Sequence, residues 1–224
     1  MYEVPRFVVE VISATLYFIL VKYMIKPYTL TKEVRYLGLP LGFAFLGVSE
    51  VILASQIIQP ITGLNGFSVA SRTFAFVFVA MTYFFSKEPS SNSQLIWSIT
   101  LSLLIVDLAA LSLVLIAPAI FNLEVPTSFS IFLRGLGLFF LGYISIYTLR
   151  EHAKKPAPTT FWIPLGFILL SISQYSQLIR IVDSGYAYGF AFVGGLVTRF
   201  VGLAVFLYVA YRAFHRLSEK ETPK

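Results

Sequence analysis

The stretch YLGLPLGFAFLGVSEVILASQIIQ, from Tyr36 to Gln59, decides the fold class of this protein. It is long enough to cross a bilayer, because a membrane helix needs about 20 largely apolar residues, and it carries one carboxylate, Glu50. A second copy, FWIPLGFILLSISQYSQLIR, lies at Phe161 to Arg180. The blocks LPLGFAFLGVSE and IPLGFILLSISQ align at an offset of 124 with six identities in twelve positions. This match indicates an internal duplication.

The composition places the chain in the membrane class. Hydrophobic residues make up 57% of the 224 and charged residues only 12%, with a mean hydropathy of +0.80, whereas soluble proteins have about 25% charged residues. The net charge of +6 would suggest a nucleic-acid partner for a soluble domain. Here the basic residues are spread over short segments between apolar runs, so membrane topology explains them and we expect no nucleic-acid binding.

Seven stretches are apolar and long enough to cross the bilayer, at roughly 7–26, 36–58, 67–85, 95–117, 129–149, 161–181 and 188–211. We therefore predict an all-α, polytopic membrane protein with seven transmembrane helices in one domain, 1–224. Repeat 1 covers about 7–85, a linker helix about 95–117 and repeat 2 about 129–211. Because the copies start four helices apart, both run the same way across the membrane. This predicts parallel three-helix repeats, helices 1–3 and 5–7, joined by helix 4.

The basic residues predict the orientation. Twelve of the 17 Lys and Arg flank the segment ends that alternate to one side: Lys22, Lys26, Lys32, Arg35, Lys87, Arg150, Lys154, Lys155, Arg212, Arg216, Lys220 and Lys224. Only Arg6 flanks the other side. The positive-inside rule then predicts a multi-pass protein of the cell membrane, with its N-terminus outside and its C-terminus in the cytoplasm.

Charged residues also remain inside the predicted helices: Glu10, Glu50, Arg72, Asp107, Arg134, Arg180 and Arg199. Each charge at the bilayer centre costs at least about 2.5–3.5 kcal/mol, so we expect these groups to be paired or used. Helical rise places them in the outer half of the membrane. In the repeat Glu50 aligns with Gln174, and Arg72 roughly matches Arg199.

The helix at 161–181 adds a polar stripe, with Ser173, Gln177 and Arg180 at spacings of four and three residues. The basic residues in the helices are all Arg and outnumber the acids, which suits bidentate binding of a carboxylate or phosphate. We predict one outward-facing cavity or network with these ligand-binding candidates: Glu50, Arg72, Asp107, Arg134, Gln174, Gln177, Arg180 and Arg199. The alternative is that Arg–carboxylate pairs only lock the helices together.

The sequence argues against several kinds of chemistry. Cys is absent, so disulfides, thiolate metal sites and a Cys nucleophile are excluded. The two His residues, His152 and His215, lie at cytoplasmic helix ends, which disfavours haem ligation and His-dependent hydrolysis. The segment 188–211 has no Lys for a retinal Schiff base, and Asp107 is the only deep Asp, whereas aspartyl proteolysis needs two. We therefore expect no enzyme activity, no cofactor and no metal site.

With the repeated LPLGFAFLGVSE and IPLGFILLSISQ blocks in a three-plus-one-plus-three helix plan, the chain resembles the seven-helix membrane regions at the N-termini of many prokaryotic sensory proteins. That resemblance implies a ligand-binding sensor. No kinase, cyclase or other output domain follows Phe214, so we expect either a cytoplasmic signalling partner, a homo-oligomer, or a sequence that is a piece of a longer protein. The plan also looks like that of sugar transporters with parallel three-helix repeats, whose Pro-Gln signature is absent here.

Three functional hypotheses follow. The first is a receptor-like sensor module whose outward-facing cavity binds a small polar or anionic ligand. The second is a small-solute transporter or channel that uses Glu50, Asp107 and Arg199 near the midplane, and the third is a structural membrane subunit of a complex. The inner halves of the helices, for example 76–80 and 203–209, are almost entirely apolar. This favours the first hypothesis, because a transporter needs an exit path.

Overall fold

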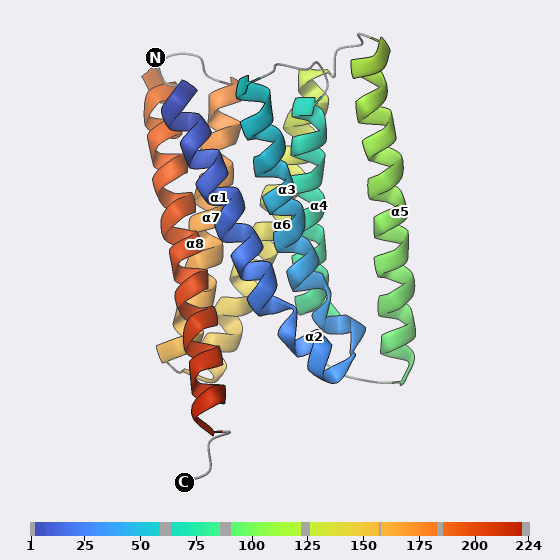
Figure 1. Ribbon diagram of the computed structural model, residues 1–224, viewed down its shortest axis with the longest axis vertical. Coiled ribbons are helices and arrows are strands. Elements are labelled where there is room, and N and C mark those ends of the chain that lie inside the picture. Colours follow the sequence, from blue (N-terminus) through green and yellow to red (C-terminus); the bar gives the residue numbers. More distant parts are fainter. Residues whose placement is uncertain are drawn as a thin grey trace.

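The computed structural model describes residues 3–58, 64–85, 91–121, 126–156, 158–182 and 186–220. These residues form α1 (Glu3–Met24), α2 (Lys26–Thr31), the 3₁₀ helix η1 (Val34–Tyr36), α3 (Gly38–Ile58), α4 (Leu64–Phe84), α5 (Ser91–Phe121), α6 (Thr127–Lys154), α7 (Pro158–Val182) and α8 (Tyr186–Lys220) (Figure 1). In this part of the chain seven helices are long and apolar enough to cross a membrane. The predicted fold class, an all-α polytopic membrane protein with seven transmembrane helices, is thereby confirmed.

Several helices extend beyond the apolar stretches that predicted them. The stretch 95–117 lies within α5, Ser91–Phe121, and 188–211 lies within α8, Tyr186–Lys220. Hydropathy detects only the part of a helix that hydrocarbon surrounds, whereas backbone hydrogen bonding continues into the polar ends. The short helices α2 and η1, between α1 and α3, add to the seven predicted helices.

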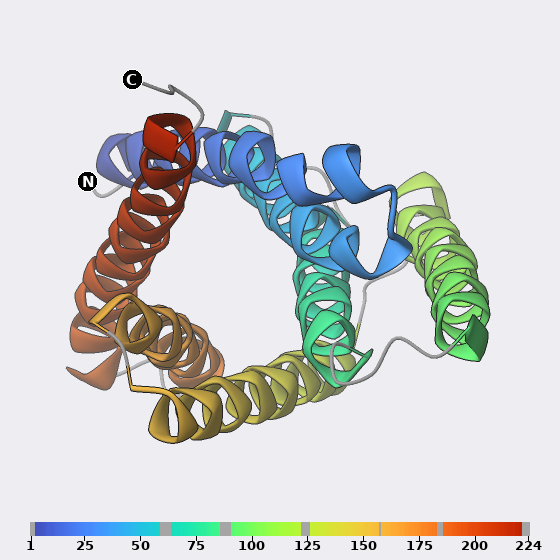
Figure 2. The ribbon, with the colours of Figure 1, turned by 90° about the horizontal axis from the view of Figure 1, so that it is seen from below.

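Six helices form a closed ring, in which each packs against its neighbours in the order α1, α3, α4, α6, α7 and α8, and α8 returns to α1 (Figure 2). The remaining long helix, α5, stands outside this ring and packs against α4. We call the end where α1, α4 and α6 begin the upper end, as drawn in Figure 1. The linker helix therefore connects the two three-helix units along the chain without forming part of the ring wall.

Apolar side chains fill the lower half of the ring. The main core cluster includes Phe43 of α3, Phe76 of α4, Phe167 of α7, and Leu203 and Phe206 of α8. The ring of Phe206 packs edge-on against Phe167 and Phe43, with centroids 4.8 Å and 5.5 Å apart. The apolar inner halves of the helices, noted in the sequence, meet here as one packed layer.

Matching glycine contacts occur in the two units. A Cβ atom on Gly42 of α3 would overlap Val79 of α4, and a Cβ atom on Gly166 of α7 would overlap Phe206 of α8. The glycines are separated by the repeat offset of 124 (42 to 166), and their partners by 127 (79 to 206). Both pairs let neighbouring helices approach closely because no side chain intervenes.

Two serine hydrogen bonds recur at the same offsets. Ser49 Oγ donates to the carbonyl oxygen of Ser68 at 3.0 Å, and Ser173 Oγ donates to that of Gly195 at 2.8 Å. The donors are 124 positions apart (49 to 173) and the acceptors 127 (68 to 195). These matching contacts support the predicted duplication, and they extend it from the second helix of each unit to the third.

Candidate functional site

Glu50 is the centre of a polar network in the upper half of the ring. Its side chain is 1% exposed, and each carboxylate oxygen meets a different guanidinium. Arg72 Nη2 of α4 lies 2.6 Å from Oε1, and Arg199 Nη1 of α8 lies 2.6 Å from Oε2. Because an unpaired buried charge is strongly destabilising, both arginines compensate the cost of burying this carboxylate.

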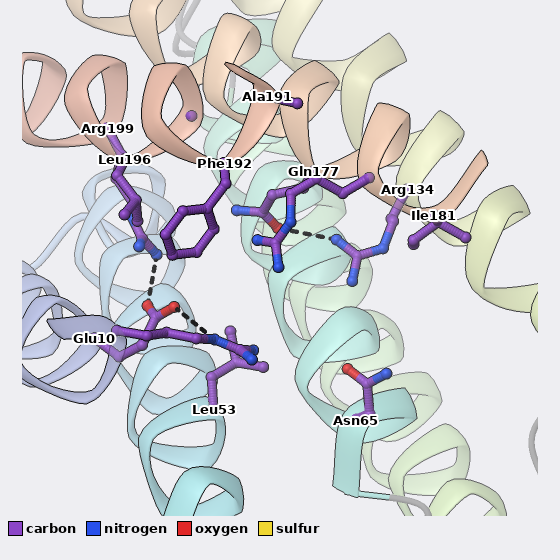
Figure 3. A pocket seen from close by; sticks show the side chains of 13 residues that line it. Glu10, Leu53, Asn65, Arg134, Gln177, Ile181, Ala191, Phe192, Leu196 and Arg199 are labelled. Carbon is purple, nitrogen blue, oxygen red and sulfur yellow. Dashed lines mark hydrogen bonds and ion pairs between the residues drawn. The ribbon is translucent and has the colours of Figure 1, made fainter. Parts of the chain in front are cut away.

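A second carboxylate, Glu10 of α1, shares the same arginine. Glu10 Oε2 lies 2.9 Å from Arg199 Nη1, and its Oε1 lies 4.0 Å from Nε of Arg6, four residues earlier on α1. Figure 3 shows Glu10 and Arg199 pointing toward one another. Arg199 therefore ties α8 to both α1 and α3.

Gln177 of α7 extends the network toward α6. Its amide oxygen accepts hydrogen bonds from Arg72 Nη1 and from Arg134 Nη1, the latter at 2.9 Å (Figure 3). In the described part of the chain, Arg134 makes this one hydrogen bond and no ion pair with a carboxylate, and its Nε is buried without a partner. Arg134 therefore keeps unused hydrogen-bonding capacity beside the network.

Every helix of the ring contributes to this network. The contributors, in chain order, are Glu10, Glu50, Arg72, Arg134, Gln177 and Arg199. Ion pairs and hydrogen bonds hold these side chains at one level of the ring, so they fix the six helices relative to one another. Three of the contacts, those of Arg199 with the two glutamates and that of Arg72 with Gln177, join one three-helix unit to the other.

A cavity of about 250 Å³ lies beside the network, toward the upper end (Figure 3). Among the residues that the structure describes, its charged lining consists of four arginines and one glutamate: Arg6, Arg134, Arg180, Arg199 and Glu10. Leu53, Phe192 and Leu196 supply apolar walls, and the guanidinium carbon of Arg180 lies 4.8 Å from the ring centroid of Phe192. The excess of guanidinium groups gives the cavity a positive charge.

The structure brings most of the predicted site residues together. Glu50, Arg72, Arg134, Gln177 and Arg199 lie in the network, and Arg180 lines the cavity. Gln174 is buried on α7 about one turn from Gln177 but does not line the cavity.

The placement predicted for Asp107 is wrong. Asp107 is exposed on α5, outside the ring, and has no ion pair or hydrogen bond with another described residue. Its depth along the helix was the basis of the prediction, and depth does not specify which way a side chain points. The proposed transporter site of Glu50, Asp107 and Arg199 therefore has no common location.

The candidate set omitted Glu10 of the network and several residues that line the cavity, among them Arg6, Asn65 and Phe192. Glu10 was identified as an intramembrane acid, but its alignment with Arg6 on one helix face, four residues apart, was the signal that could have placed both in the site. Asn65 and Phe192 also line the cavity. Nothing in their sequence surroundings marks them, because both lie among residues of ordinary membrane-helix composition.

The described residues contain no cluster of three or more His, Cys, Asp or Glu side chains that could hold a metal ion. Chemically, the site offers hydrogen-bond donors and positive charge around the small cavity. Comparison with known protein families, with curated proteins and with solved structures found no match for this chain. The functional argument therefore rests on the geometry of this site.

Proposed function

We propose that this protein is a receptor-like membrane module that binds a small anion in the arginine-lined cavity. The observation that carries the proposal is the excess of guanidinium groups, four against one carboxylate among the described residues of the lining. Arginine presents a planar fork of donors that matches a carboxylate or a phosphate. The volume of about 250 Å³ is below the range of drug-sized ligand pockets, about 300–1,000 Å³, so the ligand is a small acid or inorganic anion.

Arg134 is the residue we assign to anion contact. It lines the cavity, its hydrogen bond goes to a neutral amide, and in the described chain it has no ion pair with a carboxylate, unlike Arg199. An anion at this position would complete its hydrogen bonds. Arg199, in contrast, is already bonded to Glu10 and Glu50, and its main role is structural.

The network gives a route from ligand to conformation. Gln177 accepts from Arg134 in its own unit and from Arg72 in the other unit. An anion that draws Arg134 away from Gln177 would change a contact between the two units. A ligand can shift an equilibrium only through such a difference in contacts, and the repositioned helices would carry the signal to a cytoplasmic partner or a second copy.

The tightly packed lower half of the ring favours a receptor that binds an anion over a transporter that lets the anion through. Phe43, Phe167 and Phe206 pack together across the ring below the network, so these described side chains stand between the cavity and the lower end in this conformation. One observation favours the transporter alternative: helix packing is more extensive within each three-helix unit than across the seams between α4 and α6 and between α8 and α1. Two such units could rock against each other to alternate access.

We further propose that the cavity faces the outside, because the basic flanking residues favour a cytoplasmic lower end. The chain has no Cys, so an introduced Cys is its only thiol. Thr127 and Lys154 are exposed at the two ends of α6, which makes them a matched pair. Thr127→Cys in intact cells should react with a membrane-impermeant maleimide, and Lys154→Cys should react only after permeabilisation. The reverse pattern would invert the orientation.

The binding test uses purified protein in detergent or lipid discs and thermal unfolding with phosphate, acetate and succinate as anions and glucose as a neutral control. A ligand at 100 times its Kd stabilises the folded state by about 2.7 kcal/mol, which a melting curve resolves. We expect a stabilising anion, and Arg134→Gln should remove its effect. Arg150→Gln is the matched control, because Arg150 is exposed on the same helix outside the cavity.

A flux assay in proteoliposomes with the same anions separates the functional classes. Stabilisation without flux supports the receptor, and flux supports the transporter. If a broad panel of acids gives neither stabilisation nor flux, the network is a structural device and the proposal is wrong.

A further inference from the structure

Asp107 occupies a position that neither the network nor the cavity explains. It is the seventeenth residue of α5, a helix of 31 residues, and its side chain is exposed. In the described chain it makes no ion pair or hydrogen bond. An ionised carboxylate at this depth costs at least about 2.5–3.5 kcal/mol when it faces hydrocarbon. The protein has a carboxylate here despite this free-energy cost, which indicates that the carboxylate has a function.

The surroundings of Asp107 form an uncovered helix face. Only 17% of the apolar span of α5 is buried, against 28–67% for the other six spans. The covered side of α5 presents Trp97, Leu101 and Leu108 to the core next to α4. Asp107 lies off that stripe.

Exposed or half-buried residues continue along the Asp107 face at spacings of four and three. They are Ile96, Thr100, Leu103, Asp107, Ala110 and Val114. Residues at alternating spacings of four and three lie on one side of a helix, and such a row is what packs against a second helix at a shallow crossing angle. Ala110, next to the carboxylate, is small enough to let a partner backbone approach. The face therefore has the spacing of a helix–helix interface with a charge near its middle.

A second copy of the chain does not supply the matching charge. The arginines at comparable depth in the described helices are Arg72, Arg134, Arg180 and Arg199, and all four belong to the interior network or to the cavity lining. Two copies joined through this face would place two carboxylates together, which is unfavourable for ionised groups. The missing partner must carry its own cation.

We propose that this face of α5 docks a transmembrane helix of a different protein that carries a Lys or Arg near the middle of the membrane. Ile96, Leu103 and Val114 pack against its apolar residues, and Asp107 pairs with its cation. The pairing replaces exposure of two charges to lipid with one ion pair in low dielectric. This inference does not depend on the anion cavity, which lies inside the ring.

The test uses the full chain in phosphatidylcholine vesicles, labelled with a donor fluorophore at Asn92→Cys. The probes are designed Leu/Ala transmembrane helices carrying an acceptor and a single central Lys, a central Leu, or a Lys moved two turns toward one end. We expect the central-Lys helix to associate about tenfold more tightly than the central-Leu helix, as polar contacts in membranes allow. The displaced Lys should give a smaller gain, because its depth does not match Asp107.

Variants of the chain locate the effect. Asp107→Leu should remove the preference for the central-Lys helix, whereas the cavity variant Arg134→Gln should keep it. If all three probes associate equally, or if Asp107→Leu leaves the preference unchanged, Asp107 is a protonated lipid-facing side chain and the proposal is overturned.

Photo-crosslinking from Ala110→Cys in the native membrane tests the choice of partner. A crosslinked protein that has a Lys or Arg in a transmembrane segment, and that is lost in Asp107→Leu, supports the proposal. Crosslinks only to a second copy, or only to lipid, would overturn it.

Discussion

Glu50 and Phe43 lie two turns apart on α3, and the ring surrounds them with opposite kinds of side chain. Around Phe43, aromatic and aliphatic residues from α4, α7 and α8 pack without polar contacts between their side chains. Around Glu50, all six ring helices contribute a charged or amide group. In lipid, apolar packing gains little from the hydrophobic effect. The lower half thus depends on close fit, and the upper half on paired charges.

The upper half also contains a contrast of its own. Arg199 is 2% exposed and bonded to two glutamates, whereas Arg134 is partly exposed and bonded to one amide oxygen. A closed pair holds helices together, while an arginine with unused donors can accept a ligand. The predictions below test three contributions separately: apolar packing in the lower half, the arginine–glutamate pairs in the upper half, and anion contact by Arg134.

The largest effect should come from the central carboxylate. Glu50→Gln leaves the buried Arg72 without a carboxylate partner and Arg199 with Glu10 alone, and we expect a loss of about 3–5 kcal/mol in the free energy of unfolding. Unfolding by sodium dodecyl sulfate, followed by circular dichroism, measures this change. The double variant with Arg199→Gln should lose less than the sum of the two single variants, because the charges share one network. Strict additivity would contradict the network.

A substitution that leaves an empty space in the packed lower half should lower the free energy of unfolding somewhat less than Glu50→Gln does. Phe206→Ala removes the ring that packs on Phe43 and Phe167, and we expect a loss of about 3 kcal/mol, the low end for buried Phe→Ala changes. The lower value follows because lipid is itself apolar, so mainly the packing contribution is lost. The same unfolding assay applies, with the exposed Phe139→Ala as control. A loss above that of Glu50→Gln would reverse the comparison.

The serine contacts test the likeness of the two units. Ser49→Ala and Ser173→Ala each remove a hydrogen bond between the second and third helices of a unit, and we expect each to cost about 0.6 kcal/mol. Ser49 should cost slightly more, because its hydroxyl also pairs with that of Ser68 at 3.0 Å. A clear effect in one unit and none in the other would argue against equivalent positions.

The smallest effect on stability should come from Arg134→Gln. In the described chain this arginine pairs with no carboxylate, so its removal leaves no acid unpaired. We expect the unliganded protein to lose less than the roughly 0.6 kcal/mol typical of a hydrogen bond inside a membrane, because a largely buried cation without a carboxylate partner is removed together with the bond, while stabilisation by the bound anion disappears. A large loss of stability without ligand would move Arg134 from the ligand site to the structural network.

Much of the architecture follows from one-dimensional patterns. Membrane spans are contiguous in the chain, and each helix satisfies its own backbone hydrogen bonds, so hydropathy is enough to locate seven of them. The predicted duplication rests on the matching residues around Pro40 and Pro164. Depth within the membrane also follows from the chain, which is why Glu50, Arg72 and Arg199 could be assigned to the same half of the membrane.

What depth could not provide was direction around each helix axis. Glu10 and Asp107 are both carboxylates within apolar stretches, and hydropathy does not say which of them faces the interior of the ring. The ring closes through α1 and leaves α5 outside, so Glu10 meets Arg199 while Asp107 remains on an uncovered face. Which helices become neighbours depends on side-chain fit between distant segments, such as Gly166 against Phe206. The sequence by itself therefore determined the helices and the depth of their charges, and only the tertiary structure decided which charges meet.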